Sequence, residues 1–100
     1  MLDLSTENLT LVQAILQAHI PTSEVWVFGS RAMGNAKPFS DLDIAILADA
    51  PLASHVLIDL KEAFEQSDLP IKVDVVEFYQ LNAVFQERIK KHHYSIQSCG

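Results

Sequence analysis

The chain has 100 residues, of which 49% are hydrophobic, and its formal net charge is −6 at pH 7. This length and apolar share suffice for one ordinary hydrophobic core, so we predict a single domain over residues 1–100. The acidic balance argues against a protein that coats nucleic acid, because such binding needs a basic face to displace counterions from phosphates. A ligand that carries phosphates would therefore need a metal ion or a local basic spot.

The N-terminal residues and the cysteine content indicate the compartment. The segment MLDLSTENLT lacks the basic stretch and the long apolar block of a signal peptide, and no window reaches the roughly 18 apolar residues of a membrane span. Cys99 is the only cysteine, so it can form no internal disulfide. We therefore expect a cytoplasmic protein with no membrane contact and no extended nucleic-acid surface.

Helices and strands are predicted to alternate along the chain. Apolar residues recur at helical spacing from Ser5 to Ile20, where Ser5 or Thr6 offers a cap and Pro21 forbids continuation. The later elements are expected to be strands at 24–29, 41–49 and 71–79, a helix at 54–68, and a closing helix marked by Leu81, Val84, Phe85 and Ile89. This order predicts an α/β (α+β) fold with a small mixed sheet of three or slightly more strands and flanking helices.

Two carboxylates mark the start of the second predicted strand. Residues two apart in a strand project from the same face, so Asp41 and Asp43 present both side chains to one side. Like charges this close raise a pKa or attract a cation, and hard oxygen ligands favour magnesium or manganese over zinc. The plainer alternative is that both acids are simply polar residues at a strand entrance.

A third acid lies within the last predicted strand. Asp74 stands amid Val73, Val75 and Val76, where a carboxylate is unfavourable unless something compensates it. If the helix at 54–68 crosses over between the second and third strands, these strands are parallel and adjacent. Asp74 would then meet the first two acids at one end of the sheet.

Gly29 and Ser30 follow the first predicted strand and would complement the acids. A strand that ends in glycine and opens a helical turn exposes backbone N–H groups and the Ser30 hydroxyl, which can hold the terminal phosphates of a nucleotide. For this turn to face Asp41, the first two strands must be antiparallel, which gives the strand order 1-2-3. The segment GSRAMGN has neither a Walker-loop ending nor a Gly-X-Gly-X-X-Gly fingerprint, which leaves metal-assisted phosphoryl chemistry.

The residues around this turn leave alternatives open. Arg31 could neutralise a phosphate or be a solvated surface arginine, and Lys37 is a weaker candidate for the same role. Phe39 could pack beneath its loop or touch a base. The segment KKHHY at residues 90–94 is interpreted as a solvated helix end, because adjacent histidines on a helix point about 100° apart and cannot share a cation.

Gly29-Ser30, a ten-residue interval, Asp41-X-Asp43 and the later Asp74 together resemble the signature of the DNA polymerase β-type nucleotidyltransferase superfamily. The short chain with GSRAMGNAKPFSDLD is similar to its minimal nucleotidyltransferase (MNT, or MntA-like) branch. This resemblance implies a mixed sheet with flanking helices, with Asp41 and Asp43 binding both magnesium ions. Asp74 would bind the catalytic ion and help prepare the incoming hydroxyl, while Gly29 and Ser30 would hold the β and γ phosphates.

The resemblance also implies a partner. Members of this branch are often encoded with a helical HEPN protein, and some are antitoxins that transfer AMP from ATP to a tyrosine of that protein. The branch commonly has a second basic residue where this chain has Met33, although Lys37 could compensate. The favoured interpretation is a magnesium-dependent nucleotidyltransferase whose cleft is completed by a helical partner or a second copy. The alternative is a weakly catalytic or non-catalytic subunit that caps the HEPN partner.

Overall fold

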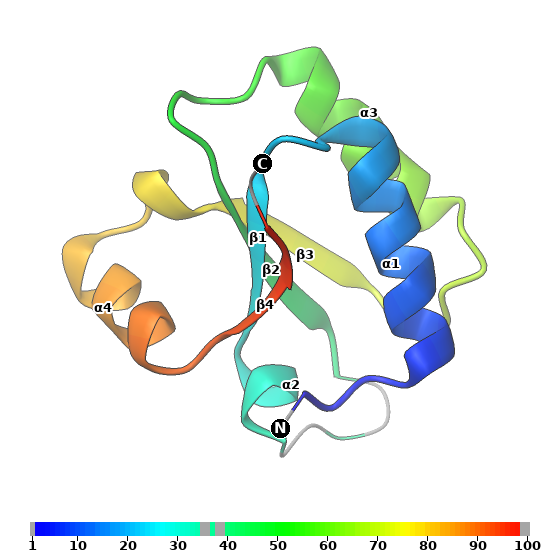
Figure 1. Ribbon diagram of the computed structural model, residues 1–100, viewed down its shortest axis with the longest axis horizontal. Helices are drawn as coiled ribbons and strands as arrows, with labels where there is room; N and C mark the ends of the chain where they lie inside the picture. The colour runs from blue at the N-terminus through cyan, green and yellow to red at the C-terminus, as the bar shows by residue number, and fades with distance from the viewer. Residues whose placement is uncertain (1, 35–36, 38–39, 99–100) are drawn as a thin grey trace.

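The structure is a computed structural model that describes residues 2–34, 37 and 40–98 (Figure 1).

The first helix begins at a side chain that caps it. Helix α1 (Thr6–His19) starts after Ser5, whose hydroxyl accepts a hydrogen bond from the Asn8 amide at 3.2 Å. A serine in this position satisfies one of the backbone N–H groups that a helix start leaves unpaired. No helix in the described part of the chain is both long and apolar enough to span a membrane.

Four strands form one mixed sheet in the order β3-β2-β1-β4 (Figure 1). They are β1 (Glu24–Phe28), β2 (Leu42–Leu47), β3 (Val73–Glu77) and β4 (Tyr94–Gln97). Strand β1 is antiparallel to both of its neighbours, whereas β2 and β3 are parallel and are joined through helix α3 (Ser54–Glu65). The predicted mixed sheet and the order 1-2-3 within it are therefore confirmed.

Residues 90–92 form an exposed helix end as expected, but a fourth strand that was not predicted begins at Tyr94. Helix α4 (Ala83–Lys91) ends at its cap His92, and the chain then turns into β4 beside β1. The ring of His93 stacks on Trp26 with centroids 3.8 Å apart and an angle of 17° between the planes. Only Ile96 in this strand is buried, so the segment carries too little apolar alternation to be recognised from the sequence.

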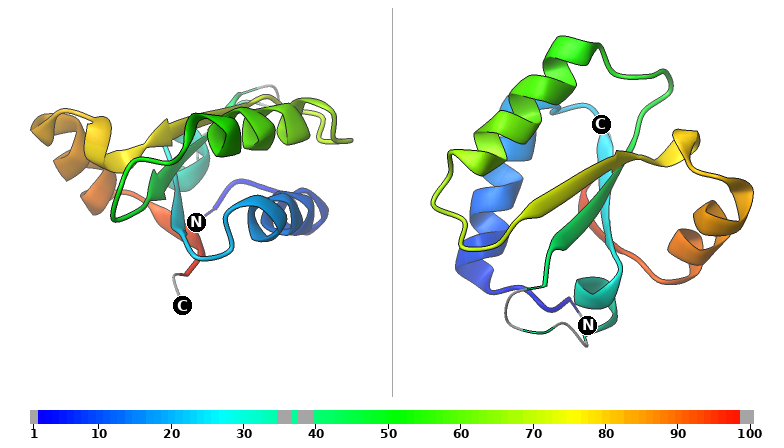
Figure 2. Two further views of the ribbon diagram at one scale, coloured as in Figure 1. Left: turned by 90° about the horizontal axis from the view of Figure 1, so that it is seen from above. Right: turned by 180° about the vertical axis from the view of Figure 1, so that it is seen from behind.

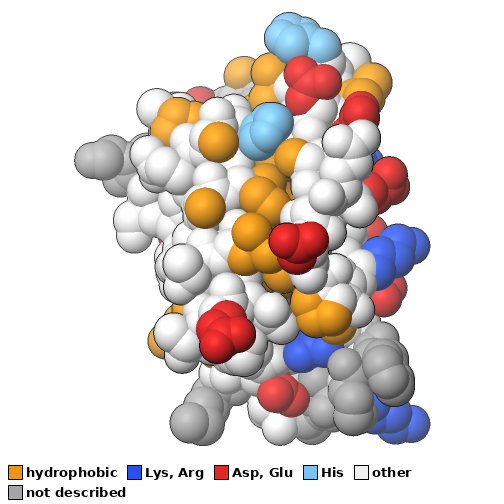
Figure 3. All heavy atoms as spheres, turned by 90° about the vertical axis from the view of Figure 1, so that its right-hand side faces the viewer, with side chains coloured by type: hydrophobic (Ala, Val, Ile, Leu, Met, Phe, Trp, Pro, Cys, Tyr) orange, Lys and Arg blue, Asp and Glu red, His pale blue; other side chains and the backbone are white. Residues whose placement is uncertain are grey.

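Helices α1 and α3 cover one face of the sheet, and α4 lies on the other (Figures 1 and 2). The space-filling view of the α1 and α3 side shows hydrophobic side chains gathered along its middle with Asp and Glu side chains around them (Figure 3). Beneath these helices lies the main core, which consists of Val12, Leu16, Ile20, Val25, Val27, Leu42, Ile44, Ile46, Leu60, Phe64, Val75 and Ile96.

The α4 face carries a smaller apolar cluster. Its buried members are Ala45, Phe78 and Ile89, and half-buried Trp26 and Phe28 pack against them. Because side chains alternate between the faces of a strand, residues at the positions between core residues point to this side. Asp43 and Asp74 occupy such positions, between Leu42 and Ile44 and between Val73 and Val75, so both project from the α4 face.

Candidate functional site

Gly29 closes β1 in a backbone conformation that glycine adopts far more readily than other residues. Its φ is +75° and its ψ is −155°, and it is the N-terminal cap of the short helix α2 (Ser30–Met33). A Cβ atom built on Gly29 would lie 2.6 Å from Oδ2 of Asp43. The absence of a side chain at Gly29 thus lets the Asp43 carboxylate lie directly against the turn.

Asp43 occupies the centre of the site because of its strand register. It is paired with Phe28 of β1, the residue before Gly29, on one side, and with Asp74 of β3 on the other. Asp41 precedes β2 by one residue and shares its side of the chain with Asp43 by alternation. The structure therefore brings the predicted turn and the three predicted acids to one end of the sheet.

The expectation that Asp74 is unfavourable among valines unless something compensates it is wrong. Its side chain is exposed, because Val73 and Val75 turn toward the α1 and α3 face while Val76 packs against the smaller cluster on the α4 face. The carboxylate therefore faces solvent and needs no buried partner. The register of parallel strands, rather than an unfavourable environment, is what places Asp74 beside Asp43.

The three carboxylates interact electrostatically. Burial raises the pKa of Asp43 above its usual value, and the negative charges of Asp74 and then Asp41 raise it further. Their oxygens are of the kind that magnesium prefers. Within the described residues, however, no three His, Cys, Asp or Glu side chains are gathered closely enough to form a metal-ligand group. The acids share one region without forming a closed cluster.

The Arg31 side chain is buried and is held by backbone carbonyls. Its Nε and Nη2 atoms donate to the carbonyl oxygen of Ser40 at 3.1 and 2.9 Å, and Nη1 donates to that of Asp3 at 2.9 Å. These contacts tie the N-terminal segment and α2 to the residue before Asp41. A role of Arg31 in nucleotide binding stays a prediction, as do those of Gly29 and Ser30, but the surface alternative for Arg31 is excluded by its burial.

The loop before β2 is only partly described. Lys37 is exposed, and its amide donates to the Ser40 hydroxyl at 3.0 Å. Phe39 lies outside the described residues, and so does Cys99. The proposed compensation by Lys37 for Met33 therefore stays a prediction.

A cavity of about 420 Å³ adjoins Gly29 and was not anticipated from the sequence. It is bounded by the end of β1, by α2 and by α4, and its lining includes Phe28, Met33, Phe85 and Arg88. Arg88 lies 57 positions after Arg31 in the sequence, with no motif around it, so only the packing of α4 reveals its place beside the turn. No local pattern in the sequence marks it.

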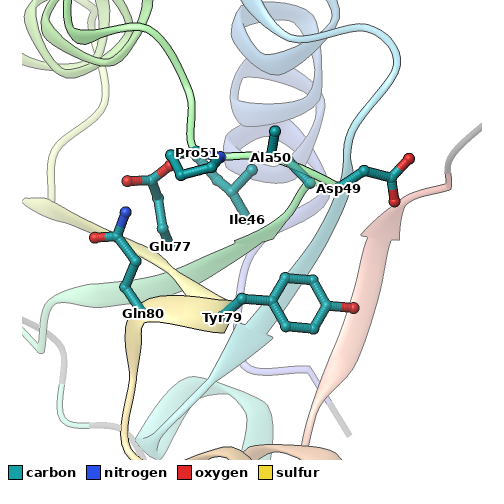
Figure 4. A pocket seen from close by; sticks show the side chains of 8 residues that line it. Ile46, Asp49, Ala50, Pro51, Glu77, Tyr79 and Gln80 are labelled. Carbon is teal, nitrogen blue, oxygen red and sulfur yellow. The ribbon is translucent and has the colours of Figure 1, made fainter.

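A second, smaller cavity of about 130 Å³ lies at the opposite end of the sheet (Figure 4). It is formed where the chain leaves β2 and β3, with Ile46, Pro51, Glu77 and Tyr79 among its lining residues. Glu77 Oε1 accepts a hydrogen bond from the Leu52 amide at 2.8 Å. This carboxylate therefore anchors the loop between β2 and α3.

Comparison with known proteins places this architecture in a family. Residues 11–98 match the family described as polymerase beta nucleotidyltransferases. A curated relative from Haemophilus influenzae, named as a probable protein adenylyltransferase MntA, is 45% identical over 96 residues, which cover 96% of this chain and 84% of the relative.

Solved structures agree with this assignment. A toxin–antitoxin structure with AMP-PNP has a TM-score of 0.75 at 25% identity, with 91% of this chain and 73% of that chain covered. A minimal nucleotidyltransferase structure has a TM-score of 0.69 at 28% identity, with 85% of this chain and 88% of that chain covered. The chain belongs to the polymerase beta-type nucleotidyltransferases and, within them, to the MntA-like protein adenylyltransferases.

Proposed function

We propose that this chain transfers AMP from ATP to a tyrosine hydroxyl of a helical HEPN-type partner and thereby acts as an antitoxin. The relative from Haemophilus influenzae carries the name of a protein adenylyltransferase, and a structural neighbour is a toxin–antitoxin structure with an ATP analogue. Residues 1–100 would act as one minimal nucleotidyltransferase domain in the cytoplasm.

The observation that carries this proposal is the position of Asp43 between the Gly29 turn and Asp74. Asp41 and Asp43 would hold two magnesium ions, with Asp74 as a further ligand of the catalytic ion, and manganese could substitute. When bound, such ions lower the pKa of an attacking hydroxyl and stabilise negative charge on the departing pyrophosphate. Burial, and then the negative charges of Asp74 and Asp41, raise the pKa of Asp43, and a bound cation would offset these effects.

The reaction joins the acceptor oxygen to the α-phosphorus of ATP and breaks the bond between that phosphorus and the oxygen bridging to the β-phosphate. Pyrophosphate leaves with this oxygen, and the hydroxyl proton passes to Asp74 or to solvent. Gly29 and Ser30 would hold the β and γ phosphates, because a turn without a side chain allows close approach of a ligand to the backbone. Arg31 would act indirectly, through its hydrogen bonds to the Ser40 carbonyl before Asp41.

The direct test is label transfer. The purified chain is incubated with magnesium, ATP labelled at the α-phosphate and a HEPN-type partner, and the partner is analysed by intact-mass measurement for added AMP. We expect Asp41→Asn and Asp43→Asn to lower transfer by about 1,000-fold or more, because each removes a carboxylate from the proposed ion site. Asp59→Asn, an exposed acid on α3, is the matched control and should leave transfer unchanged.

Two outcomes would contradict the proposal. Unchanged transfer by the Asp41 and Asp43 variants would remove these acids from the chemistry. Tight binding of the partner without transfer under any metal condition would instead support a non-catalytic capping subunit. Circular dichroism of each variant excludes loss of fold as the cause of lost activity.

A further inference from the structure

We propose that Arg88 on α4 binds the terminal phosphates of the nucleotide from the cavity beside Gly29. This inference rests on the proposed function in one respect only, namely that a nucleoside triphosphate binds at the Gly29 turn. It assigns a residue that is far from the acids and the turn in sequence and that no motif identified. It also specifies which part of the nucleotide that residue contacts.

The cavity lies directly beside the Gly29 turn. Gly29 forms part of its wall, and the same glycine lies against the Asp43 carboxylate. Gly29 therefore has the cavity of about 420 Å³ and the Asp43 carboxylate as neighbours, with no side chain of its own between them. A polyphosphate that passes over the Gly29 backbone has the cavity on one side and the acids on the other.

The cavity is lined largely by apolar side chains and is open to solvent. Phe28 and Phe85 meet edge to face with ring centroids 5.8 Å apart, and Met33 adds a further apolar side chain. Met33 and Phe85 are 57% and 40% exposed, and Arg88 is exposed as well, so the cavity is open to solvent. An anion can therefore enter it directly from solution.

Arg88 is the arginine available for this purpose. Within the described part of the chain, its guanidinium makes no hydrogen bond and no ion pair, whereas Lys90 on the same helix pairs with Glu87 at 3.4 Å. Arg31 is already held by two backbone carbonyls. The planar fork of a guanidinium suits bidentate contact with phosphate oxygens and keeps its charge at all accessible pH values.

The overall charge favours such a cation. The protein carries a net charge of −6, and the Asp43 carboxylate lies against the Gly29 turn. The field of the protein therefore opposes a polyanion, and a local positive charge adds to the attraction that metal ions supply. Met33 contributes none, so the positive charge at the cavity comes from Arg88 on α4.

Calorimetric titration with three ligands tests this assignment. ATP, AMP and inorganic tripolyphosphate, each with magnesium, are titrated into the wild-type chain, Arg88→Ala, Arg88→Lys and the control Lys91→Ala. Lys91 lies on the same helix and is exposed, but it does not line the cavity. We expect Arg88→Ala to weaken ATP and tripolyphosphate about 10- to 100-fold, Arg88→Lys to weaken them less, and AMP binding to change by less than about twofold.

A rescue variant distinguishes a charge effect from a structural one. Met33 and Arg88 line the same cavity, so Met33→Arg combined with Arg88→Ala should restore most of the ATP affinity. Rescue of this kind would not follow if Arg88→Ala merely disturbed α4. The thermal midpoint should also be unchanged, because the Arg88 side chain is exposed.

The possible contrary results separate failure of the Arg88 assignment from failure of the proposed function. Equal losses for AMP and ATP would overturn the phosphate assignment and place the nucleoside in the cavity, and no loss for any ligand would overturn it entirely. An unaltered KM for ATP in Arg88→Ala, with wild-type transfer intact, would overturn this inference alone. Failure of the wild-type chain to bind ATP or to transfer AMP would instead count against the proposed function.

Discussion

Between the sheet and helices α1 and α3, aliphatic side chains from every strand form a continuous core, whereas the α4 face has few buried residues and carries the acids at one end. Strand β2 contributes to both faces. Leu42, Ile44 and Ile46 are fully buried on the first face, and Asp43 stands between them on the second. Strand β2 thus contributes alternate residues to the core, and the residue between two of them presents a carboxylate on the other face.

This difference teaches how so small a protein separates stability from chemistry. The α1 and α3 face can fix the strand register without help from the α4 face, because its apolar contacts come from all four strands. Register, in turn, places Asp43 beside Asp74. The α4 face can therefore leave like charges next to one another, a costly arrangement that the opposite face must offset.

The largest expected effect comes from weakening the core face. Ile44→Ala should reduce the free energy of unfolding by about 2–4 kcal/mol, because it removes a fully buried side chain and leaves a cavity. Val76→Ala is the matched control on the α4 face and should cost only about 1 kcal/mol, since Val76 is half-buried. Urea unfolding followed by circular dichroism measures both. Equal losses would show that the two faces contribute alike to stability.

The next effect comes from the glycine turn. Gly29→Ala should lower transfer more than 100-fold and cost about 1–3 kcal/mol, because φ is +75° and the new Cβ would lie 2.6 Å from the Asp43 carboxylate. Gly34, with φ +76° and ψ 18°, caps the other end of α2 in the left-handed region. Gly34→Ala should cost about 1 kcal/mol yet retain most of the transfer activity. Comparable activity losses in the two variants would indicate that backbone strain, rather than the displaced carboxylate, is responsible.

A smaller effect is expected at Arg31. Arg31→Lys keeps the charge but cannot reproduce the fork that holds the Ser40 and Asp3 carbonyls, so it should cost about 1–2 kcal/mol. Because Ser40 precedes Asp41, transfer should fall roughly tenfold through an altered position of that carboxylate. The magnesium concentration for half-maximal transfer should rise, while direct ATP binding without magnesium stays unchanged. A loss of metal-free ATP binding would instead support direct contact between Arg31 and phosphate.

The comparison of faces also explains what the sequence could predict. The alternation of Asp41 and Asp43 and the crossover through α3 follow from local periodicity and from the handedness of parallel connections, so the order of three strands was predictable. The main core follows from the same alternation. These features depend on residues close together in the chain or on one general rule of connection.

Other features depend on contacts between distant residues, which periodicity does not report. Strand β4 pairs with β1 although only Ile96 in it is buried, and its approach is accompanied by the stacking of His93 on Trp26. Asp74 projects from the α4 face and is exposed, and this exposure depends on how much of that face α4 covers. The sequence leaves Arg31 either as a phosphate ligand or as a surface residue, whereas in the structure it is buried and donates to the carbonyl of the distant Asp3.

The smallest expected effect concerns the cost of placing Asp43 among other acids. Its pKa is raised in the folded protein above the usual value of 3.8, so the ionised form is less favourable in the native state than in the unfolded chain. At pH values above the folded-state pKa this difference lowers stability. The cost decreases as the pH falls through the folded-state pKa, because the native state takes up the proton first, and it is gone below the unfolded-state value of 3.8. In metal-free buffer at pH 7, Asp43→Asn should therefore raise the thermal midpoint by about 1–3 °C, a small gain because solvent screens the half-exposed side chain.

Salt and magnesium distinguish the causes of that gain. Repulsion from Asp74 and Asp41 is screened at about 1 M salt, whereas the cost of burial is not, so the part of the gain that persists in high salt measures burial. Burial is the larger cause of the raised pKa, and most of the gain should therefore persist. With magnesium the wild-type chain should be more stable than Asp43→Asn, because the ion stabilises the wild-type carboxylates and the variant has one carboxylate fewer to bind it. A wild-type chain more stable than Asp43→Asn at pH 7 without magnesium would mean that Asp43 already has a favourable partner, and that the acids on the α4 face do not carry a cost that the opposite core must offset.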